Sequence, residues 1–220
     1  MTRWVKPLPP PAPPPGSSGR DGIAAALVGL VGVTAAAALM VLVPEEESGR
    51  RVEAQVSERG DATLRHVSGR QYLETYIDIA GVPTACDGIT RGIQPGQSFT
   101  EARCTALLIR EIEIHARGAL ACAPSLARPG RDYQRVAAIS LTFNIGVGGF
   151  CGSSARRLFE AGNISAACDR FLPWSKARVN GVLREVRGLT RRRHREREYC
   201  RTGLPGYTPA SLPARLEKWK

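Results

Sequence analysis

Oxygen-bearing side chains gather between positions 74 and 84 of this chain. The stretch includes, in order, Glu74, Tyr76, Asp78, Gly81 and Thr84. A carboxylate can activate a water molecule or stabilise a developing positive charge, and a threonine hydroxyl can hold that water. The spacing suits an Asp78 and a Thr84 that face each other across a hairpin whose turn contains Gly81. The alternative is that both residues serve only the turn, as Asp and Thr commonly do.

The elements that must position these residues are one short strand and several helices. Residues 76–79 form a short strand candidate, and Gly81, Pro83 and Gly88 exclude a long helix around them. From Thr100 onward, apolar residues recur at helical spacing. Further helices are predicted at 134–144, 154–160, 164–171 and 188–200. The pattern predicts an α+β fold that is mostly α.

An uncharged apolar segment covers Gly22–Val43, 22 residues. As a helix it would measure roughly 33 Å, enough to cross a hydrocarbon core of roughly 30 Å. Arg3, Lys6 and Arg20 precede it and residues 45–47 are all Glu, so the positive-inside rule places the N-terminus in the cytoplasm and the rest outside. A cleaved signal peptide would have a shorter apolar run, and a buried helix is rarely so uniformly apolar.

The composition of this segment is unusual for an anchor. Ala, Gly and Thr34 make up 11 of the 22 residues, and such residues contribute little to partitioning into a bilayer. The segment could therefore leave the membrane at modest cost, particularly if the folded domain offers it a groove. The alternative is an ordinary anchor whose small residues pack against another helix.

The rest of the chain divides by composition. A Pro-rich start cannot build a core, a polar stretch follows the apolar segment, and periodic patterns begin near Leu64. The predicted parts are a disordered cytoplasmic tail (1–21), a transmembrane or signal-arrest segment (22–43), a linker (44–63), a folded domain (64–202) and a C-terminal tail (203–220).

Charge and cysteine content limit the partners and the compartment. The chain has 31 Lys and Arg against 20 Asp and Glu, a net charge of +11, which favours a polyanionic partner such as nucleic acid, acidic lipid or cell wall polymer. All the cysteines follow the apolar segment and form an even set, which indicates an oxidising compartment. Without a C-x-x-C spacing, zinc is disfavoured and no metal is expected. Fifteen disulfide connectivities are possible for Cys86, Cys104, Cys122, Cys151, Cys168 and Cys200.

Four motifs in order resemble the family-24 glycoside hydrolases, the phage-type lysozymes. The first is the spacing of Tyr76, Asp78, Gly81 and Thr84, and the others are an Asn-x-Gly turn, a helix pair and a C-terminal signature. These last three lie at 143–150, 162–174 and 188–200. With the apolar segment, the arrangement resembles the signal-arrest-release endolysins of lambdoid phages.

The resemblance implies a two-lobed lysozyme-like domain with a small β-hairpin, preceded by one transmembrane helix. It implies hydrolysis of the β-1,4 bond between N-acetylmuramic acid and N-acetylglucosamine in peptidoglycan, with lysis of the host. Asp78 would be the second carboxylate, Thr84 would hold the attacking water, and Tyr76 and Asn144 would bind substrate. Family-like positions suggest disulfides between Cys86 and Cys104 and between Cys168 and Cys200, which leaves Cys122 with Cys151.

The partners follow from the same resemblance. The protein is expected to act on peptidoglycan strands as a monomer, without a cofactor, and to be held by residues 22–43 in the bacterial inner membrane with its catalytic domain in the periplasm. Arginines between 184 and 201 could contact anionic wall or lipid, or could pair with Glu196 and Glu198. Nucleic acid is not expected, because this stretch lies beyond the membrane and lacks interleaved aromatic residues.

The general acid departs from the family pattern. The family has a Glu nine residues before its Asp, and the residue nine before Asp78 is Gly69. With one inserted residue, Ser68 would take the acid's place, and Ser cannot protonate a glycosidic oxygen at neutral pH. Three explanations stay open: Glu74 takes the acid role, His66 or another group acts in a modified mechanism, or the domain binds glycan without cutting it. The other motifs favour an endolysin over a non-catalytic, membrane-anchored peptidoglycan-binding protein.

Overall fold

A computed structural model of the chain describes residues 22–78, 81–179 and 181–205. Its elements are mostly helices with short two-stranded sheets, as predicted. In chain order they are α1 (Ala25–Val31), α2 (Val33–Glu47), β1 (Arg51–Val56), β2 (Ala62–Ser68), β3 (Tyr76–Ile77), β4 (Pro83–Thr84), α3 (Glu101–Cys122), the 3₁₀ helix η1 (Pro124–Ala127), α4 (Asp132–Gly152), α5 (Ser154–Glu160), α6 (Ile164–Asp169), η2 (Leu172–Ser175), β5 (Lys176–Val179), β6 (Val182–Glu185) and α7 (Arg187–Arg201). The predicted tail 1–21 and most of the tail 203–220 lie outside the described residues.

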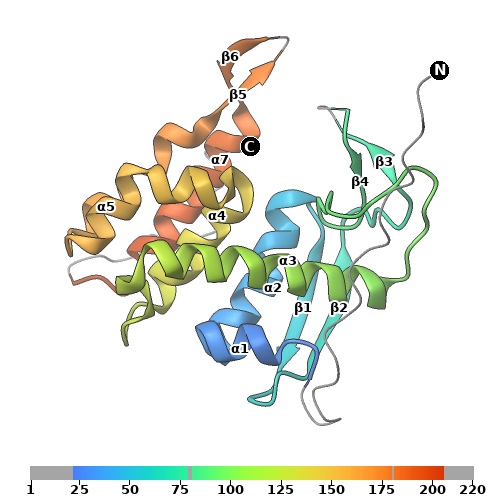
Figure 1. Ribbon diagram of the computed structural model, residues 1–220, viewed down its shortest axis with the longest axis horizontal. Coiled ribbons are helices and arrows are strands. Elements are labelled where there is room, and N and C mark those ends of the chain that lie inside the picture. Colours follow the sequence, from blue (N-terminus) through green and yellow to red (C-terminus); the bar gives the residue numbers. More distant parts are fainter. Residues whose placement is uncertain (1–21, 79–80, 180, 206–220) are drawn as a thin grey trace, which may run out of the picture.

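The molecule has two lobes joined by α3 (Figure 1). Strands β1 to β4 lie at one end of α3, and helices α4 to α7 gather at the other. The α3 helix begins where the Thr100 side chain accepts a hydrogen bond from the Arg103 amide at 3.2 Å, which satisfies one of its free N–H groups. The α4 helix bends at Gly146, where φ is 77°, and continues to Gly152, so the predicted turn is a break inside a longer helix.

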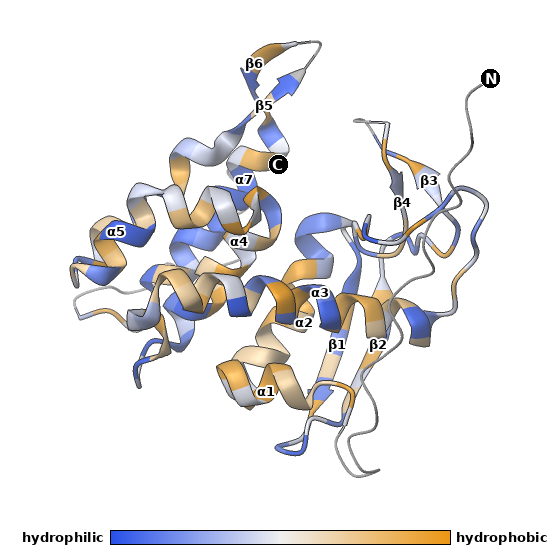
Figure 2. Cartoon of the chain, in the orientation of Figure 1, coloured by the Kyte–Doolittle hydropathy of each residue, from blue (hydrophilic) through white to orange (hydrophobic). Residues whose placement is uncertain are grey.

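The apolar segment 22–43 is not one straight helix in this structure. It forms α1 and the first part of α2, which meet at Gly32 with a bend of 111°. Figure 2 shows both helices largely in the colour of apolar residues and the last turn of α2 as hydrophilic. By length and composition, this bent pair and the half-buried α4 are the described helices that could cross a membrane.

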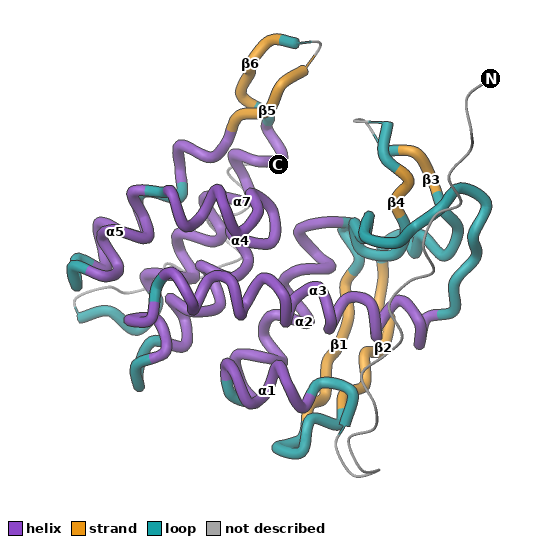
Figure 3. Tube along the Cα trace, viewed as in Figure 1, coloured by secondary structure: helices purple, strands orange, loops and turns teal. Residues whose placement is uncertain are grey.

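A β-hairpin occupies most of the stretch for which a linker was predicted. Strand β1 pairs antiparallel with β2, with Val56 opposite Ala62 across the turn, and Figure 3 shows these two long strands beside α2. Folded structure therefore begins at Gly22 and not near Leu64. The apolar side chains of β1, including Ala54 and Val56, alternate with polar ones and pack against the core next to α2, which is why the strand holds to the domain.

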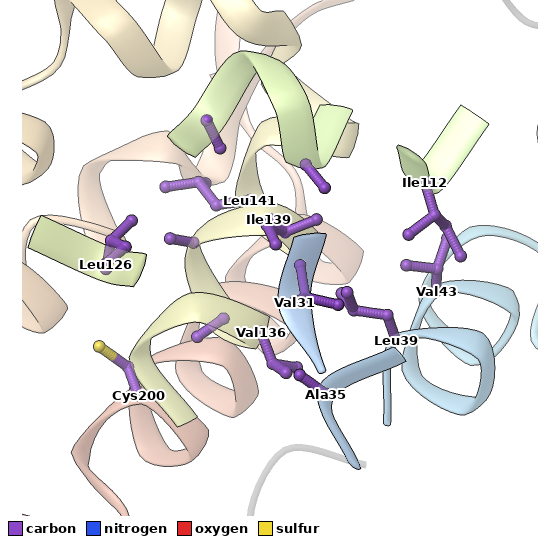
Figure 4. Close-up of a cluster of buried hydrophobic side chains, with 14 of the residues drawn as sticks. Val31, Ala35, Leu39, Val43, Ile112, Leu126, Val136, Ile139, Leu141 and Cys200 are labelled. Atoms are coloured by element: carbon purple, nitrogen blue, oxygen red, sulfur yellow. The ribbon is translucent and has the colours of Figure 1, made fainter. Parts of the chain in front are cut away.

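The apolar segment is the centre of the hydrophobic core. Eight of its side chains are at most 2% exposed: Ala24, Leu27, Val31, Ala35, Ala36, Leu39, Met40 and Val43. Figure 4 shows some of them in a single cluster with side chains of α3 and α4 such as Ile112 and Ile139. Burying a Leu, Val or Met side chain contributes about 1.5–3 kcal/mol. The fold described here therefore depends on the segment.

Three disulfides are present, and they confirm the pairing that the family resemblance implied. Cys86 bonds to Cys104, Cys122 to Cys151 and Cys168 to Cys200. The first ties the loop after β4 to α3, the second ties α3 to α4, and the third ties α6 to α7. The lobes are thus cross-linked along the second half of the chain.

Candidate active site

The β3–β4 hairpin carries three of the predicted site residues. Tyr76 lies opposite Thr84 in the strand register. Asp78 begins the turn: its amide donates to the Val82 carbonyl at 3.0 Å, and its Oδ1 accepts from the Val82 amide at 2.8 Å. Because side chains two residues apart point to the same face of a strand, Asp78 lies on the face of Tyr76 and Thr84. The predicted hairpin is confirmed, with Asp78 at its end and not directly opposite Thr84.

The Thr84 hydroxyl is oriented by the main chain. Thr84 is 3% exposed, and its Oγ1 donates to the Val82 carbonyl at 3.0 Å. A hydroxyl has one proton to donate and two lone pairs. With the proton directed at Val82, the lone pairs remain free to accept a hydrogen bond from a water molecule, which suits the predicted role.

A further carboxylate, on the last residue of α2, lies beside the loop that follows the β3–β4 hairpin. The Glu47 carboxylate accepts a hydrogen bond from Arg192 Nη1 on α7. Its Oε2 would lie 3.3 Å from a Cβ built on Gly88, a residue that follows β4 by four positions and has a φ of +78°. A glycine at position 88 therefore gives the Glu47 carboxylate room beside the end of the β3–β4 hairpin.

The pKa of Tyr76 indicates which acidic groups lie near its ring. The pKa of Tyr76 is raised above its usual value, first by burial and then by the negative fields of Tyr72, Asp78, Glu47 and Asp87. Two carboxylates from different elements, those of Glu47 and Asp78, thus act on the same side chain. Tyr76 is thus a neighbour that Glu47 and Asp78 have in common.

A cavity opens between the end of α2 and the helical lobe. Its volume is about 640 Å³, in the range of ligand-binding clefts. Glu47 and Asn144 both line it, and the Asn144 side-chain oxygen accepts from Arg193 Nη2 at 3.0 Å. Asn144, a predicted substrate-binding residue, therefore faces the same cavity as Glu47. Its remaining lining residues are Glu45, Glu46, Val186, Gly188, Leu189, Arg191, Arg192 and Arg195.

Buried arginines of α7 hold the acidic end of α2. Arg192 Nε lies 3.0 Å from the fully buried Glu196, which also accepts from Ser140 Oγ at 2.7 Å. Burial lowers the pKa of Arg192, but the carboxylates of Glu47 and Glu196 outweigh it and raise the pKa above its usual value. Arg192 and Arg193, at 3% and 0% exposure, are thus neither a solvated helix face nor a surface for anionic wall polymer.

The family can now be identified from the sequence match. The model of the family "Phage lysozyme" matches residues 68–196 of this chain. That is more than half of its length. The chain belongs to the phage lysozyme family.

Individual relatives of this phage lysozyme agree. It is 36% identical over 138 residues to the SAR-endolysin of Enterobacteria phage P21, an alignment that covers 62% of this chain and 79% of the relative. Its fold is similar to that of the muramidase domain of SpmX from Asticaccaulis excentricus, with a TM-score of 0.59, 21% identity and coverage of 75% and 95%. It is also similar to the active form of the P1 phage endolysin Lyz, with a TM-score of 0.57, 22% identity and coverage of 87% and 100%. The chain is a glycosidase of the phage endolysin type.

The sequence offered Glu74, His66 and the family position at Gly69 as places for the acid of this phage lysozyme. Glu74 is exposed and lies in a β-bridge with Ser98. His66 lies on β2, opposite Val52. At Gly69, the position that family spacing assigns to the acid, a Cβ would approach the Gly49 carbonyl oxygen to 2.4 Å, so a glutamate cannot be placed there without moving the backbone.

Sequence reasoning missed Glu47 because of the β1–β2 hairpin. The family spacing places the acid nine residues before the Asp, whereas Glu47 lies 31 positions before Asp78. The matched region begins at Ser68, the last residue of β2, and so excludes α2. The available signal was the run of three glutamates, Glu45–Glu47, that follows the apolar segment.

Proposed function

We propose that this phage endolysin hydrolyses the β-1,4 bond between N-acetylmuramic acid and N-acetylglucosamine in peptidoglycan, with Glu47 as its general acid. The observation that supports this proposal is the position of the Glu47 carboxylate against Gly88, four residues after the strand that ends at Thr84. Glycoside hydrolysis needs one carboxyl group to protonate the leaving oxygen and another to assist the attack on the sugar.

Each group has one task in the proposed mechanism. Glu47 donates its proton to the glycosidic oxygen as the bond to the anomeric carbon breaks. Thr84 holds a water molecule through its free lone pairs, and Asp78 stabilises the positive charge of the oxocarbenium-like centre and takes the proton from the attacking water. Asn144 contacts the part of the glycan that lies in the cavity beside α2, and Tyr76 contacts the part that lies against the β3–β4 hairpin.

The experiment compares single variants of the full chain on purified peptidoglycan, measured by the release of reducing ends. Glu47→Gln and Asp78→Asn are each expected to lower the rate by roughly 10²–10⁴-fold, the usual contribution of general acid–base catalysis, and Thr84→Ala by less. Glu74→Gln is the matched control, because Glu74 is an exposed carboxylate four residues before Asp78.

The outcomes separate the candidates for the acid. Loss of cleavage in Glu47→Gln with near-normal cleavage in Glu74→Gln supports the assignment. Loss in Glu74→Gln with normal cleavage in Glu47→Gln would transfer the acid role to Glu74. If the parent chain binds peptidoglycan and releases no reducing ends, the alternative of a non-catalytic wall-binding protein holds.

The apolar segment gives this endolysin two states. In the first, residues 22–43 cross the inner membrane with the N-terminus in the cytoplasm, the orientation that flanking charges favour, and the catalytic domain lies in the periplasm. In the second, the same residues form α1 and α2 in the core. The states exclude each other, since side chains such as Leu39 and Met40, both 0% exposed in the fold, cannot also face lipid.

This exclusion makes release the activating step. Glu47 is the last residue of α2, only four positions after Val43. While residues 22–43 are in the bilayer, α2 cannot pack on α4 and β1, and Glu47 cannot reach Gly88. A reporter enzyme fused after Lys220 tests the orientation: activity on the periplasmic side is expected, and activity in the cytoplasm would overturn this topology.

A further inference from the structure

The chain makes a detour between the two halves of the catalytic site. It leaves α2 through Gly49, runs through the β1–β2 hairpin, and returns at Gly69, where a Cβ would lie 2.4 Å from the Gly49 carbonyl oxygen. Both glycines have positive φ, 72° and 92°, a conformation that favours glycine. Thirty residues separate Glu47 from Asp78. Chain connectivity therefore does not fix the acid relative to the β3–β4 hairpin.

A buried ion pair closes this gap. Arg50 Nε donates to Asp87 Oδ1 at 2.9 Å and Arg50 Nη2 donates to Asp87 Oδ2 at 2.6 Å, a bidentate geometry. The Ser48 hydroxyl donates to the same Asp87 Oδ1 at 2.8 Å. The side chains of Arg50 and Asp87 are 6% and 1% exposed. The pair therefore joins Arg50, three positions after Glu47, to Asp87, three positions after Thr84.

The Asp87 end of this pair is rigidly supported. Its neighbour Cys86 is bonded to Cys104 on α3, and the Cys86 amide donates to the Tyr72 carbonyl at 2.8 Å. Cys86 itself has a φ of 55°, which is uncommon for a residue with a side chain. A backbone held in such a conformation is over-determined by its surroundings. Asp87 is thus a fixed point against which the Arg50 segment is aligned.

We propose that Arg50 and Asp87 are positioning residues that hold the Glu47 carboxyl in register with Asp78 and Thr84. This inference rests on the proposed function of Glu47 as the acid. A buried ion pair is a poor source of stability, because desolvation offsets the attraction of its charges. Its directional bonds are what a neutral, well-packed pair cannot supply. A displacement of about 1 Å at a reacting group can cost about 100-fold in rate.

The test measures kcat and KM for reducing-end release from soluble peptidoglycan strands, together with the midpoint of thermal unfolding, on the full chain. The single variants Arg50→Gln and Asp87→Asn are expected to lower both the midpoint and kcat. In the double variant Arg50→Met/Asp87→Leu no charge is left buried and unpaired, so the midpoint recovers. Because the two hydrogen bonds from Arg50 to Asp87 are absent, kcat stays about 10- to 100-fold below that of the parent, and KM changes little.

Two further variants complete the design. Arg50→Lys retains the charge and one contact and is expected to give a kcat between those of the parent and of Arg50→Gln. Arg65→Gln is the matched control on the same hairpin, since the Arg65–Glu53 pair has both side chains at least 60% exposed. Because an exposed ion pair contributes little to stability, this variant is expected to keep the kcat and the unfolding midpoint of the parent.

Each outcome decides a question. A double variant that recovers the midpoint but not kcat supports the positioning role, whereas recovery of both shows that the pair is only structural and overturns it. A loss confined to KM also overturns it. Absence of cleavage by the parent chain overturns the proposed function itself, and with it the role of Arg50 and Asp87.

Discussion

The two halves of the catalytic site are built in different ways. Asp78 and Thr84 lie six positions apart on one hairpin, where pairing of Tyr76 with Thr84 and the turn at Gly81 set their relation. Glu47 is placed by distant parts of the chain: α7 through Arg192, the turn after β4 through Gly88, and the core through α2. The half with Asp78 and Thr84 is local, because one hairpin forms it, and the half with Glu47 is assembled from distant parts of the chain.

If residues 22–43 start in the membrane, as proposed, this difference explains how the protein can be exported without being active. The local half can form as soon as its hairpin folds, because its contacts are short in sequence. The assembled half requires the apolar segment to be in the core. Control over that single segment is therefore control over catalysis.

The strongest test of the assembled half is Arg192→Gln. Arg192 is 3% exposed and contacts Glu47 and Glu196. Its loss leaves the part-buried Glu47 without this partner and the buried Glu196 with only Arg193 and Ser140, at a cost of about 3 kcal/mol. Chemical denaturation measures this loss. Its neighbour Arg191, which is exposed, provides the control: Arg191→Gln is expected within about 0.5 kcal/mol of the parent. Equal stability of the two variants would show that α7 does not hold α2.

A milder variant sharpens the comparison at Glu47 itself. Glu47→Asp keeps the carboxyl group but withdraws it by one methylene, about 1 Å, which is expected to lower kcat by about 100-fold. Glu74→Asp makes the same change on an exposed residue and should have no effect. Near-normal kcat in Glu47→Asp would contradict an acid whose position is critical.

A substitution in the turn of the β1–β2 hairpin tests whether this turn holds the apolar segment in the core. The Gly60 carbonyl accepts from the Ala24 amide at 2.8 Å, and a Cβ on Gly60 would lie 2.2 Å from the Ala25 nitrogen. Gly60→Ala is expected to destabilise the fold by about 2–3 kcal/mol. Gly130→Ala is the control, because Gly130 also has a positive φ but nothing within 4 Å, and should cost about 1 kcal/mol. Similar midpoints of thermal unfolding for both variants would show that the turn at Gly60 does not hold the apolar segment in place.

The smallest effect concerns pH. Burial raises the pKa of Glu46 above 4.5, although Arg195 opposes the shift. The folded state then binds more protons than the unfolded state, so the contribution of Glu46 to stability is full below pH 4.5 and is lost as the pH rises through the folded value. Urea denaturation between about pH 4 and 7 should show a smaller decline for Glu46→Gln than for the parent. Parallel curves would contradict the shift.

The sequence was sufficient where structure depends on neighbouring residues. The β3 strand and the helices α3, α5 and α7 follow from local periodicity, and the disulfides follow from the family resemblance. The β1 strand also carried a signal, because Val52, Ala54 and Val56 alternate with polar residues. Its alanine weakened that pattern, and its charges favoured a linker.

The apolar segment and the acid could not be predicted in the same way. Uniform apolarity indicates burial without saying whether lipid or protein surrounds the helix, and Gly32 alone does not predict a bend of 111°. Glu47 was missed because the β1–β2 hairpin lengthens the chain between Glu47 and Asp78, so the family spacing does not point to it. Only tertiary contacts, such as those with Gly88 and Arg192, bring it to the site.

The cross-links of this molecule are separated along the chain from the part that changes place. Every disulfide lies between Cys86 and Cys200, whereas residues 22–78 contain no cysteine. The oxidised scaffold can therefore be finished before the segment arrives, and insertion of the segment requires neither thiol exchange nor cleavage of a bond. Under the proposed release from the membrane, the onset of lysis would be timed by a physical property of the membrane and would need no thiol chemistry.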